Sequence, residues 1–267
     1  MISLKNIKKS FGHPDGITQI FEGLNLTIAT GQFVSILGPN GCGKSTLFNL
    51  ITGVDIVFEG EVIIDGKSGA VNEKISYMYQ KDLLLPWLTI EKNILLGLKI
   101  QKKITSETDK VMNDYLEMMG ISHLKEKYPS GLSGGEKQKV SLIRTLILEN
   151  PILLLDEPFS AIDYNTRLEL QAAIIDYSKK NNTTVLLVSH DIDEAIVVSD
   201  RILLFDFKPH GILLDLEIDI QSINRDPAVV RQNPAFAKNF ELIWKKYPRW
   251  KRRSEIFCLS LSHWSCS

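Results

Sequence analysis

The segment Gly38-Pro-Asn-Gly-Cys-Gly-Lys-Ser-Thr46 constrains the fold of this chain more than any other part of the sequence. It fits the pattern G-x-x-x-x-G-K-[ST], follows the apolar run 33–37 directly, and leads into a helical pattern that begins at Lys44. An ordinary glycine turn that happens to contain Lys-Ser does not require a strand before it and a helix after it. Residues 38–46, called the phosphate loop below, therefore predict a phosphate-binding turn between a strand and a helix of an α/β fold.

The residue types in the phosphate loop suit a nucleotide. Glycines let backbone N–H groups approach phosphate oxygens without Cβ clashes, and the helix N-terminus adds partial positive charge. We expect Lys44 to hold the β- and γ-phosphates of ATP, and the Ser45 hydroxyl to ligate Mg²⁺. Cys42 is interpreted as a small tolerated side chain rather than a redox group. The predicted ATP contacts in the loop are Gly38, Pro39, Asn40, Gly41, Cys42, Gly43, Lys44, Ser45 and Thr46.

A second acidic element lies at Ile152-Leu-Leu-Leu-Asp-Glu-Pro158, where an apolar run ends in two carboxylates. Successive strand residues face opposite ways, so the two carboxylates can have different roles. Asp156 is expected to support Mg²⁺, and Glu157 to polarise the water that attacks the γ-phosphate. Taken alone, this run is as consistent with a solvated strand end. The phosphate loop earlier in the chain favours the catalytic interpretation.

The wider pattern alternates strands with helices, which indicates an α/β core. Short β-type runs occur at 24–28, 33–37, 61–65, 75–79, 152–155, 184–188 and 201–205, and helical patterns at 44–52, 107–119, 135–149, 165–179, 191–198 and 234–246. The stretch from about 82 to 129 has helical periodicity and few strand-like runs. We interpret it as a mostly helical insert.

Composition excludes several classes of function. Lys and Arg total 31 against 32 Asp and Glu, giving a net charge of -1, so we expect no nucleic-acid partner. The three cysteines, Cys42, Cys258 and Cys266, form no CxxC pair, which favours a reducing cytosol. No apolar run approaches the ~18 residues of a membrane-spanning helix, and the start lacks the apolar core of a signal peptide. If the protein serves a membrane, another chain must cross it.

The segment Leu132-Ser-Gly-Gly-Glu136 resembles the signature motif of ABC ATPases. Physically, Ser133 and its two glycines open a helix and create a second anion-binding N-terminus. The resemblance implies that two copies stack head to tail, and that the signature of one closes over ATP held by the other. Lys139 stands where many relatives have Arg, and its role stays open. The predicted contacts across the dimer are Leu132, Ser133, Gly134, Gly135 and Glu136, called the signature segment below.

Four further positions match the family. The resemblance implies that Gln80 contacts Mg²⁺ and the attacking water, and that His190 contacts the γ-phosphate. It also implies that Phe11 stacks on adenine and that Asp163, in Ser160-Ala-Ile-Asp163, crosses the dimer interface. The alternatives are an ordinary loop glutamine for Gln80, core packing for Phe11 and a helix N-cap for Asp163. The predicted catalytic set is Glu157, His190 and Gln80, and the predicted metal set is Ser45, Gln80 and Asp156.

The resemblance covers roughly residues 2–217. It implies a P-loop NTPase ABC ATPase core, with a β-subdomain and an inserted helical subdomain at about 82–130. Residues 218–267 are predicted to form a C-terminal extension that is helical in part and disordered at its end. Its run from Trp244 to Arg253 mixes aromatic and basic residues; a solvated terminus is the simpler interpretation, and binding to lipid headgroups is the alternative.

The segment Lys81-Asp-Leu-Leu-Leu-Pro-Trp-Leu-Thr89 is similar to one in the importer branch for nitrate, sulfonates, taurine, bicarbonate and some thiamine-precursor pyrimidines. In that branch it docks the membrane subunit, although Trp87 and residues 83–85 also suit a helical core. The chain is thus expected to hydrolyse ATP for an importer of a small anionic solute. Its implied partners are a second ATPase copy, membrane permease subunits and, indirectly, a solute-binding protein, at the cytoplasmic face of the inner membrane.

The alternative function is a soluble ABC ATPase of the translation or repair type. Such proteins usually carry two cassettes in one chain, long coiled coils or zinc sites. This sequence shows one cassette, no heptad array and no cysteine cluster, which disfavours that alternative.

Overall fold

The computed structural model describes residues 1–14, 16–69, 72–206, 211–220 and 226–246. They fall into two compact units, one within 1–70 and 188–267 and the other within 71–187. No helix in these ranges is both long enough and apolar enough to cross a membrane. The predictions for the tail beyond residue 246, with Cys258 and Cys266, lie outside the described residues.

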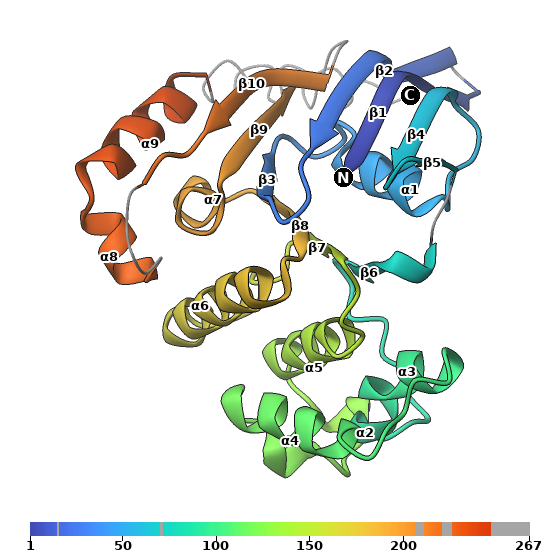
Figure 1. Ribbon diagram of the computed structural model, residues 1–267, viewed down its shortest axis with the longest axis vertical. Helices are drawn as coiled ribbons and strands as arrows, with labels where there is room; N and C mark the ends of the chain where they lie inside the picture. The colour runs from blue at the N-terminus through green and yellow to red at the C-terminus, as the bar shows by residue number, and fades with distance from the viewer. Residues whose placement is uncertain (15, 70–71, 207–210, 221–225, 247–267) are drawn as a thin grey trace, which may run out of the picture. The chain divides into compact units, whose positions relative to one another are not determined.

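The first unit contains a four-stranded antiparallel sheet in the order β2-β1-β4-β5 (Figure 1). The strands are β1 (Ile2–His13), β2 (Gly16–Ile28), β4 (Glu59–Ile64) and β5 (Lys67–Ser68). Ile2, Leu4 and Ile7 of β1 are buried. Between Lys9 and Ser10 of β1 the register with β2 shifts, so that Ile20 of β2 has no partner there. This bulge brings Ile20 and Phe21 against the phosphate loop of the same unit, as described below.

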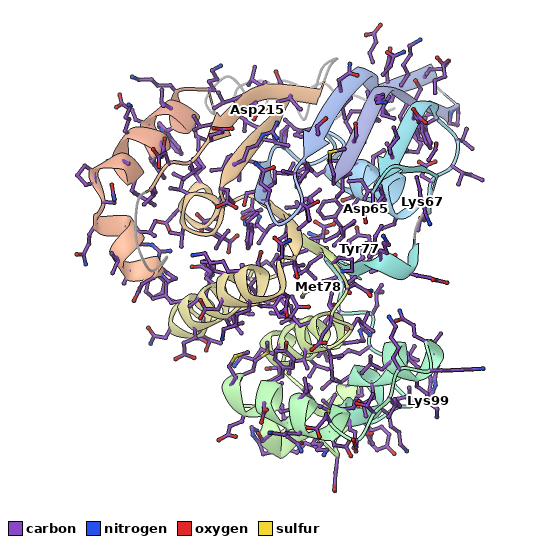
Figure 2. All side chains as sticks on the ribbon, viewed as in Figure 1. Asp65, Lys67, Tyr77, Met78, Lys99 and Asp215 are labelled. Carbon is purple, nitrogen blue, oxygen red and sulfur yellow. The ribbon has the colours of Figure 1, made fainter. Side chains whose placement is uncertain are left out.

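The first unit also contains β3 (Phe33–Leu37), β9 (Arg201–Asp206) and β10 (Gly211–Glu217). β3 is parallel to β9, and β10 is antiparallel to β9. Every residue of β3 is buried, as expected for a strand covered on both faces. Asp215 of β10, labelled in Figure 2, forms an ion pair of 2.6 Å with Arg201 of β9.

The described residues of the first unit also form four helices. They are α1 (Lys44–Thr52), α7 (Ile192–Val198), α8 (Pro227–Gln232) and α9 (Pro234–Lys246). The last three lie side by side (Figure 1). Arg231 of α8 forms an ion pair of 2.5 Å with Asp193 of α7, which ties these two helices together.

In the second unit β6 (Ile75–Met78) lies parallel to β7 (Ile152–Asp156), and β8 (Thr184–Ser189) contains the boundary with the first unit. The helices are α2 (Ile90–Ile94), α3 (Leu96–Ile100), α4 (Thr108–Met118), α5 (Gly134–Leu146) and α6 (Tyr164–Asn181). Short 3-10 turns occur at Asn72–Lys74, Ser122–Leu124 and Pro129–Gly131. The described residues 82–131 form helices and turns without a strand.

The pattern-based prediction misses β1, the first half of β2, β10 and α8. β1 contains three Lys and one Asn, residue types that disfavour strands, and its pairing with two neighbours overrides that preference. α5 was expected to run to residue 149 but ends at Leu146. Glu149 has a left-handed backbone (φ 51°) and Pro151 follows, so the helix cannot continue.

Candidate ATP-binding and hydrolysis site

The phosphate loop joins β3 to α1 in the first unit. Gly43, the N-cap of α1, has φ 105°, a conformation that favours glycine. A Cβ there would lie 2.6 Å from Cγ2 of Ile20 and 2.8 Å from Cζ of Phe21. The loop thus requires glycine at this position for two separate reasons. Because no side chain caps α1, the N–H groups at its start suit an anion.

The Lys44 side chain is buried within the same loop. Its Nζ donates to the carbonyl oxygens of Gly38, at 2.6 Å, and of Pro39, at 2.8 Å. This holds the cation inside the curve of the loop, where a phosphate group would approach. Burial raises the pKa of the Cys42 thiol, although the nearby Lys44 acts in the opposite direction. Both observations fit a cradle for phosphate in which Cys42 is a packing residue.

Two more predicted residues lie in the first unit. Phe11 is on β1 and is 38% exposed, so part of its ring surface is accessible. The Nζ of Lys9 lies 4.6 Å from the centroid of that ring. His190 is exposed and immediately follows β8; the next residue, Asp191, caps α7 by accepting from the N–H of Asp193 and of Glu194. Adenine stacking by Phe11 and phosphate contact by His190 stay predictions.

The second unit brings two predicted catalytic residues together. Parallel β6 and β7 end at the same edge, with Met78 opposite Leu155. Gln80 follows β6 and Glu157 follows β7, and Gln80 Nε2 donates to Glu157 Oε2 at 3.0 Å. Glu157 has φ 51°, a sparsely populated conformation for a residue with a side chain. Non-glycine residues in this conformation concentrate at functional sites.

Asp156, the last residue of β7, is buried. It contacts Tyr77 of β6, which is labelled in Figure 2. Burial and the neighbouring Asp156 raise the pKa of Tyr77, so its hydroxyl stays protonated and can donate to the carboxylate. The Tyr77 and Tyr79 rings stack with centroids 3.9 Å apart. Asp156 is thus held by a neighbour that the sequence patterns did not single out.

The signature segment begins α5 with a reciprocal cap. The N–H of Ser133 donates to Glu136 Oε2 at 2.7 Å, its hydroxyl donates to the same oxygen at 2.8 Å, and the N–H of Glu136 donates back to Ser133 Oγ at 3.3 Å. The two bonds from Ser133 lower the pKa of the Glu136 carboxyl. In this structure the helix start satisfies its own N–H groups in part, unlike the start of α1.

Gln138 is a site residue that the sequence analysis missed. Its Nε2 donates to the carbonyl oxygen of Glu157 at 2.8 Å, and its Oε1 accepts from the N–H of Ala161 at 2.9 Å. A Cβ on Gly135 would lie 2.9 Å from the Ala161 carbonyl oxygen. The start of α5 is therefore fixed against residues 157–161. The available signal was a polar residue on the buried face of α5, one turn from the signature segment.

Asp163 and Lys139 both form hydrogen bonds with backbone groups of the second unit. Asp163 accepts from the N–H of Thr166 at 3.1 Å, which matches the N-cap alternative and lowers the pKa of its carboxyl. Lys139 donates to the carbonyl oxygen of Met119 at 3.0 Å and so ties α5 to the end of α4. A role for Asp163 across a dimer interface stays a prediction.

The segment 81–89 is held by α5. Arg144 donates to the carbonyl oxygens of Leu83, at 2.9 Å, and of Asp82, at 2.5 Å. Leu84 is buried, whereas Trp87 is 69% exposed. The ring of Trp87 is therefore not a core residue of this unit.

Comparison with known proteins identifies the family of this chain. Residues 21–160 match the protein-family model described as ABC transporter. The chain belongs to this family and has the fold of its ATP-binding cassettes, a P-loop NTPase core of mixed α/β sheets, as the signature resemblance predicted. It is an ATP-binding subunit of the class whose ATP hydrolysis is coupled to transport.

Two relatives and one solved structure illustrate the similarity. The chain is 40% identical over 248 residues to the uncharacterized ABC transporter ATP-binding protein YtlC of Bacillus subtilis, covering 89% of this chain and 95% of that protein. It is 40% identical over 209 residues to the aliphatic sulfonates import ATP-binding protein SsuB of Bacillus cereus, covering 78% and 82%. The dimeric, post-hydrolysis structure of the ATP-binding cassette MJ0796 with ADP and Pi has a TM-score of 0.76 and 30% identity, covering 83% of this chain and 100% of that chain.

Proposed function

We propose that the chain hydrolyses ATP to drive an importer of a small anionic solute, working as a pair at the cytoplasmic face of a membrane. The observation that carries this proposal is the hydrogen bond from Gln80 to Glu157. It joins the proposed catalytic carboxylate to the residue that directly precedes the segment 81–89, where Trp87 is exposed. Events at the nucleotide and at a docked membrane partner are thereby coupled through one side chain.

The chemistry follows from the residues described. Lys44 and the N–H groups at the start of α1 bind the phosphates, and His190 contacts the γ-phosphate. Glu157 accepts a proton from the attacking water, which the Gln80 amide helps to orient. Ser45, Asp156 and Gln80 would hold Mg²⁺, which supplies charge neutralisation at the phosphate oxygens when bound. The buried carboxylate of Asp156 and the hydroxyl of Ser45 are oxygen ligands of the kind that Mg²⁺ prefers.

Pairing gives the signature segment its role. Ser133 and the glycines after it would contact the γ-phosphate of the nucleotide on the second copy, and Asp163 would lie at the same interface. The dimeric MJ0796 structure with ADP and Pi supports this arrangement by similarity. ATP then closes the two copies together, and hydrolysis releases them.

The partners follow from the same proposal. Trp87 and Leu83 form the surface that docks a membrane permease subunit, and a solute-binding protein delivers the solute to that permease. SsuB, an importer subunit for aliphatic sulfonates by its name, supports a small anionic solute. We propose that residues 1–217 form the ATPase domain, with its helical subdomain at about 82–130, and that 218–267 form an extension. Neither relative favours a soluble translation or repair ATPase.

A pull-down from membranes tests the proposal. The Glu157→Gln variant, held closed by ATP and Mg²⁺, is used to capture partners from solubilised membranes of the native host, and mass spectrometry identifies them. Glu157→Gln carrying Trp87→Ala serves as the matched control, because it keeps the nucleotide site. We expect a multi-spanning permease with the first variant and much less with the second. Recovery of ribosomal or DNA-bound proteins alone would contradict the proposal.

A further inference from the structure

We infer that Lys9 is a positioning residue for nucleotide binding: it holds the Phe11 ring in the orientation that stacks on adenine. This rests on the proposed contact between Phe11 and the base. Lys9 and Phe11 are two positions apart on β1, so their side chains project from the same face of the sheet. The ammonium lies 4.6 Å from the ring centroid, within the range of a cation–π interaction.

The cation is fixed more firmly than a surface lysine would be. Lys9 is 5% exposed, and its Nζ contacts Asp55 Oδ1 at 2.7 Å and donates to the carbonyl oxygen of Val57 at 2.7 Å. Two strong acceptors therefore leave the ammonium little freedom to move. Since the cation covers one face of the Phe11 ring, the exposed part of the ring is kept free for a flat partner.

The same contacts tie the aromatic ring to the phosphate loop. Asp55 comes shortly after α1, and its N–H donates to the carbonyl oxygen of Asn49 in that helix at 3.1 Å. On the other side, Lys9 pairs in register with Phe21, the residue whose ring lies against Gly43. Lys9 thus links Phe11 to α1 through Asp55 and to Gly43 of the phosphate loop through Phe21. These contacts tie the proposed base site to the phosphate loop.

Lys8 offers a matched control on the same strand. Its Nζ forms an ion pair of 2.9 Å with Glu59 Oε2, and both side chains are largely exposed. Replacing Lys8 by Met removes one positive charge from β1, as replacing Lys9 by Met does. It leaves the ring contact intact, so the two variants separate a positioning effect from a general electrostatic one.

The experiment measures binding of ATP and of inorganic tripolyphosphate to the full chain by isothermal titration calorimetry. For Lys9→Met we expect about tenfold weaker ATP binding and tripolyphosphate binding within about twofold of the unchanged protein. Lys8→Met should change neither. Asp55→Asn, which retains Lys9 but loosens it, should weaken ATP binding in the same direction by a smaller factor. Phe11→Ala should weaken the binding of ATP and leave the binding of tripolyphosphate unchanged.

The outcomes distinguish this inference from the proposed function. Equal losses of ATP and tripolyphosphate binding in Lys9→Met would overturn the inference, because the residue would then support the whole unit. If Lys9→Met binds ATP as the unchanged protein does, while Phe11→Ala binds ATP more weakly, the inference about Lys9 is overturned and the proposed adenine contact of Phe11 is retained. Unchanged ATP binding in Phe11→Ala would refute the adenine contact itself, and the role of Lys9 with it.

Discussion

Two glycine-rich helix starts in this chain have opposite local chemistry. α1 begins at Gly43, where no side chain caps the helix, and the Lys44 cation is buried beside it. α5 begins at Ser133 with a complete capping box that includes the Glu136 carboxylate. The first start can take an anion without help. The second presents a carboxylate and a partly satisfied cap, so it suits a weaker contact made only when another molecule brings the phosphate to it.

The largest expected effect is on ATP affinity, and it compares Lys44 at the start of α1 with Ser133 at the start of α5. Lys44→Ala removes the cation that its contacts with Gly38 and Pro39 hold inside the curve of the phosphate loop, and we expect ATP affinity to fall by about a hundredfold. Calorimetric titration of the full chain with ATP measures it. Ser133→Ala, at the other helix start, should leave the affinity of a single copy nearly unchanged. Equal losses in the two variants would break the comparison.

A pair of glycine variants tests the backbone difference. Gly43→Ala forces a Cβ into a left-handed conformation and to within 2.6 Å of Ile20, so we expect a loss of about 2–4 kcal/mol in the free energy of unfolding. Gly134→Ala, whose Cβ would meet nothing within 4 Å, should be close to neutral. Chemical denaturation of both variants measures this. A Gly134→Ala variant as unstable as Gly43→Ala would contradict the described geometry.

The cap itself should have a smaller effect. Ser133→Ala removes the hydroxyl that bonds Glu136 in both directions, and we expect a loss of about 1 kcal/mol in the free energy of unfolding. Ser130→Ala, outside the cap, is the control, and urea denaturation compares the two. Stability unchanged by Ser133→Ala would mean that the capping box contributes nothing.

The smallest effect depends on pH. Because the pKa of Glu136 is lowered in the folded state, its contribution to stability is present above the unfolded value, near 4.5, and is lost as pH falls through the folded value. Glu136→Gln should therefore be less stable than the unchanged protein at pH 7, and the difference should shrink in acid. Unfolding midpoints across a pH series measure it. A difference that grows in acid would have the wrong sign.

The sequence predicted the elements nearest the phosphate loop best. β3 and α1 have the predicted bounds because a strand buried on both faces reads as an unbroken apolar run and a glycine loop marks the helix start. The α9 helix was also predicted at its observed bounds, from the spacing of its apolar residues. β10 was missed, since its pairing with β9 depends on a partner that local patterns do not reveal.

The candidate site was predictable only where motifs carry it. Glu157 was named from the apolar run that ends in two carboxylates, and Gln80 from the resemblance; the structure places their side-chain atoms 3.0 Å apart. Gln138 and Lys9 were not named, because their roles depend on contacts with residues distant in the sequence. A Lys on a strand has no local feature that distinguishes it from a solvated side chain, and the place of Gln138 one turn from the signature segment does not by itself reveal its partners.

The central claim is that ATP joins two copies, each supplying the signature segment to the other's nucleotide. The most direct test is the mass in solution of Glu157→Gln, measured by analytical ultracentrifugation with and without ATP and Mg²⁺. We expect the 30.2 kDa monomer without nucleotide and about twice that mass with it. Adding Lys44→Ala should abolish the shift. A variant that binds ATP yet stays monomeric at every protein concentration tested would contradict the claim.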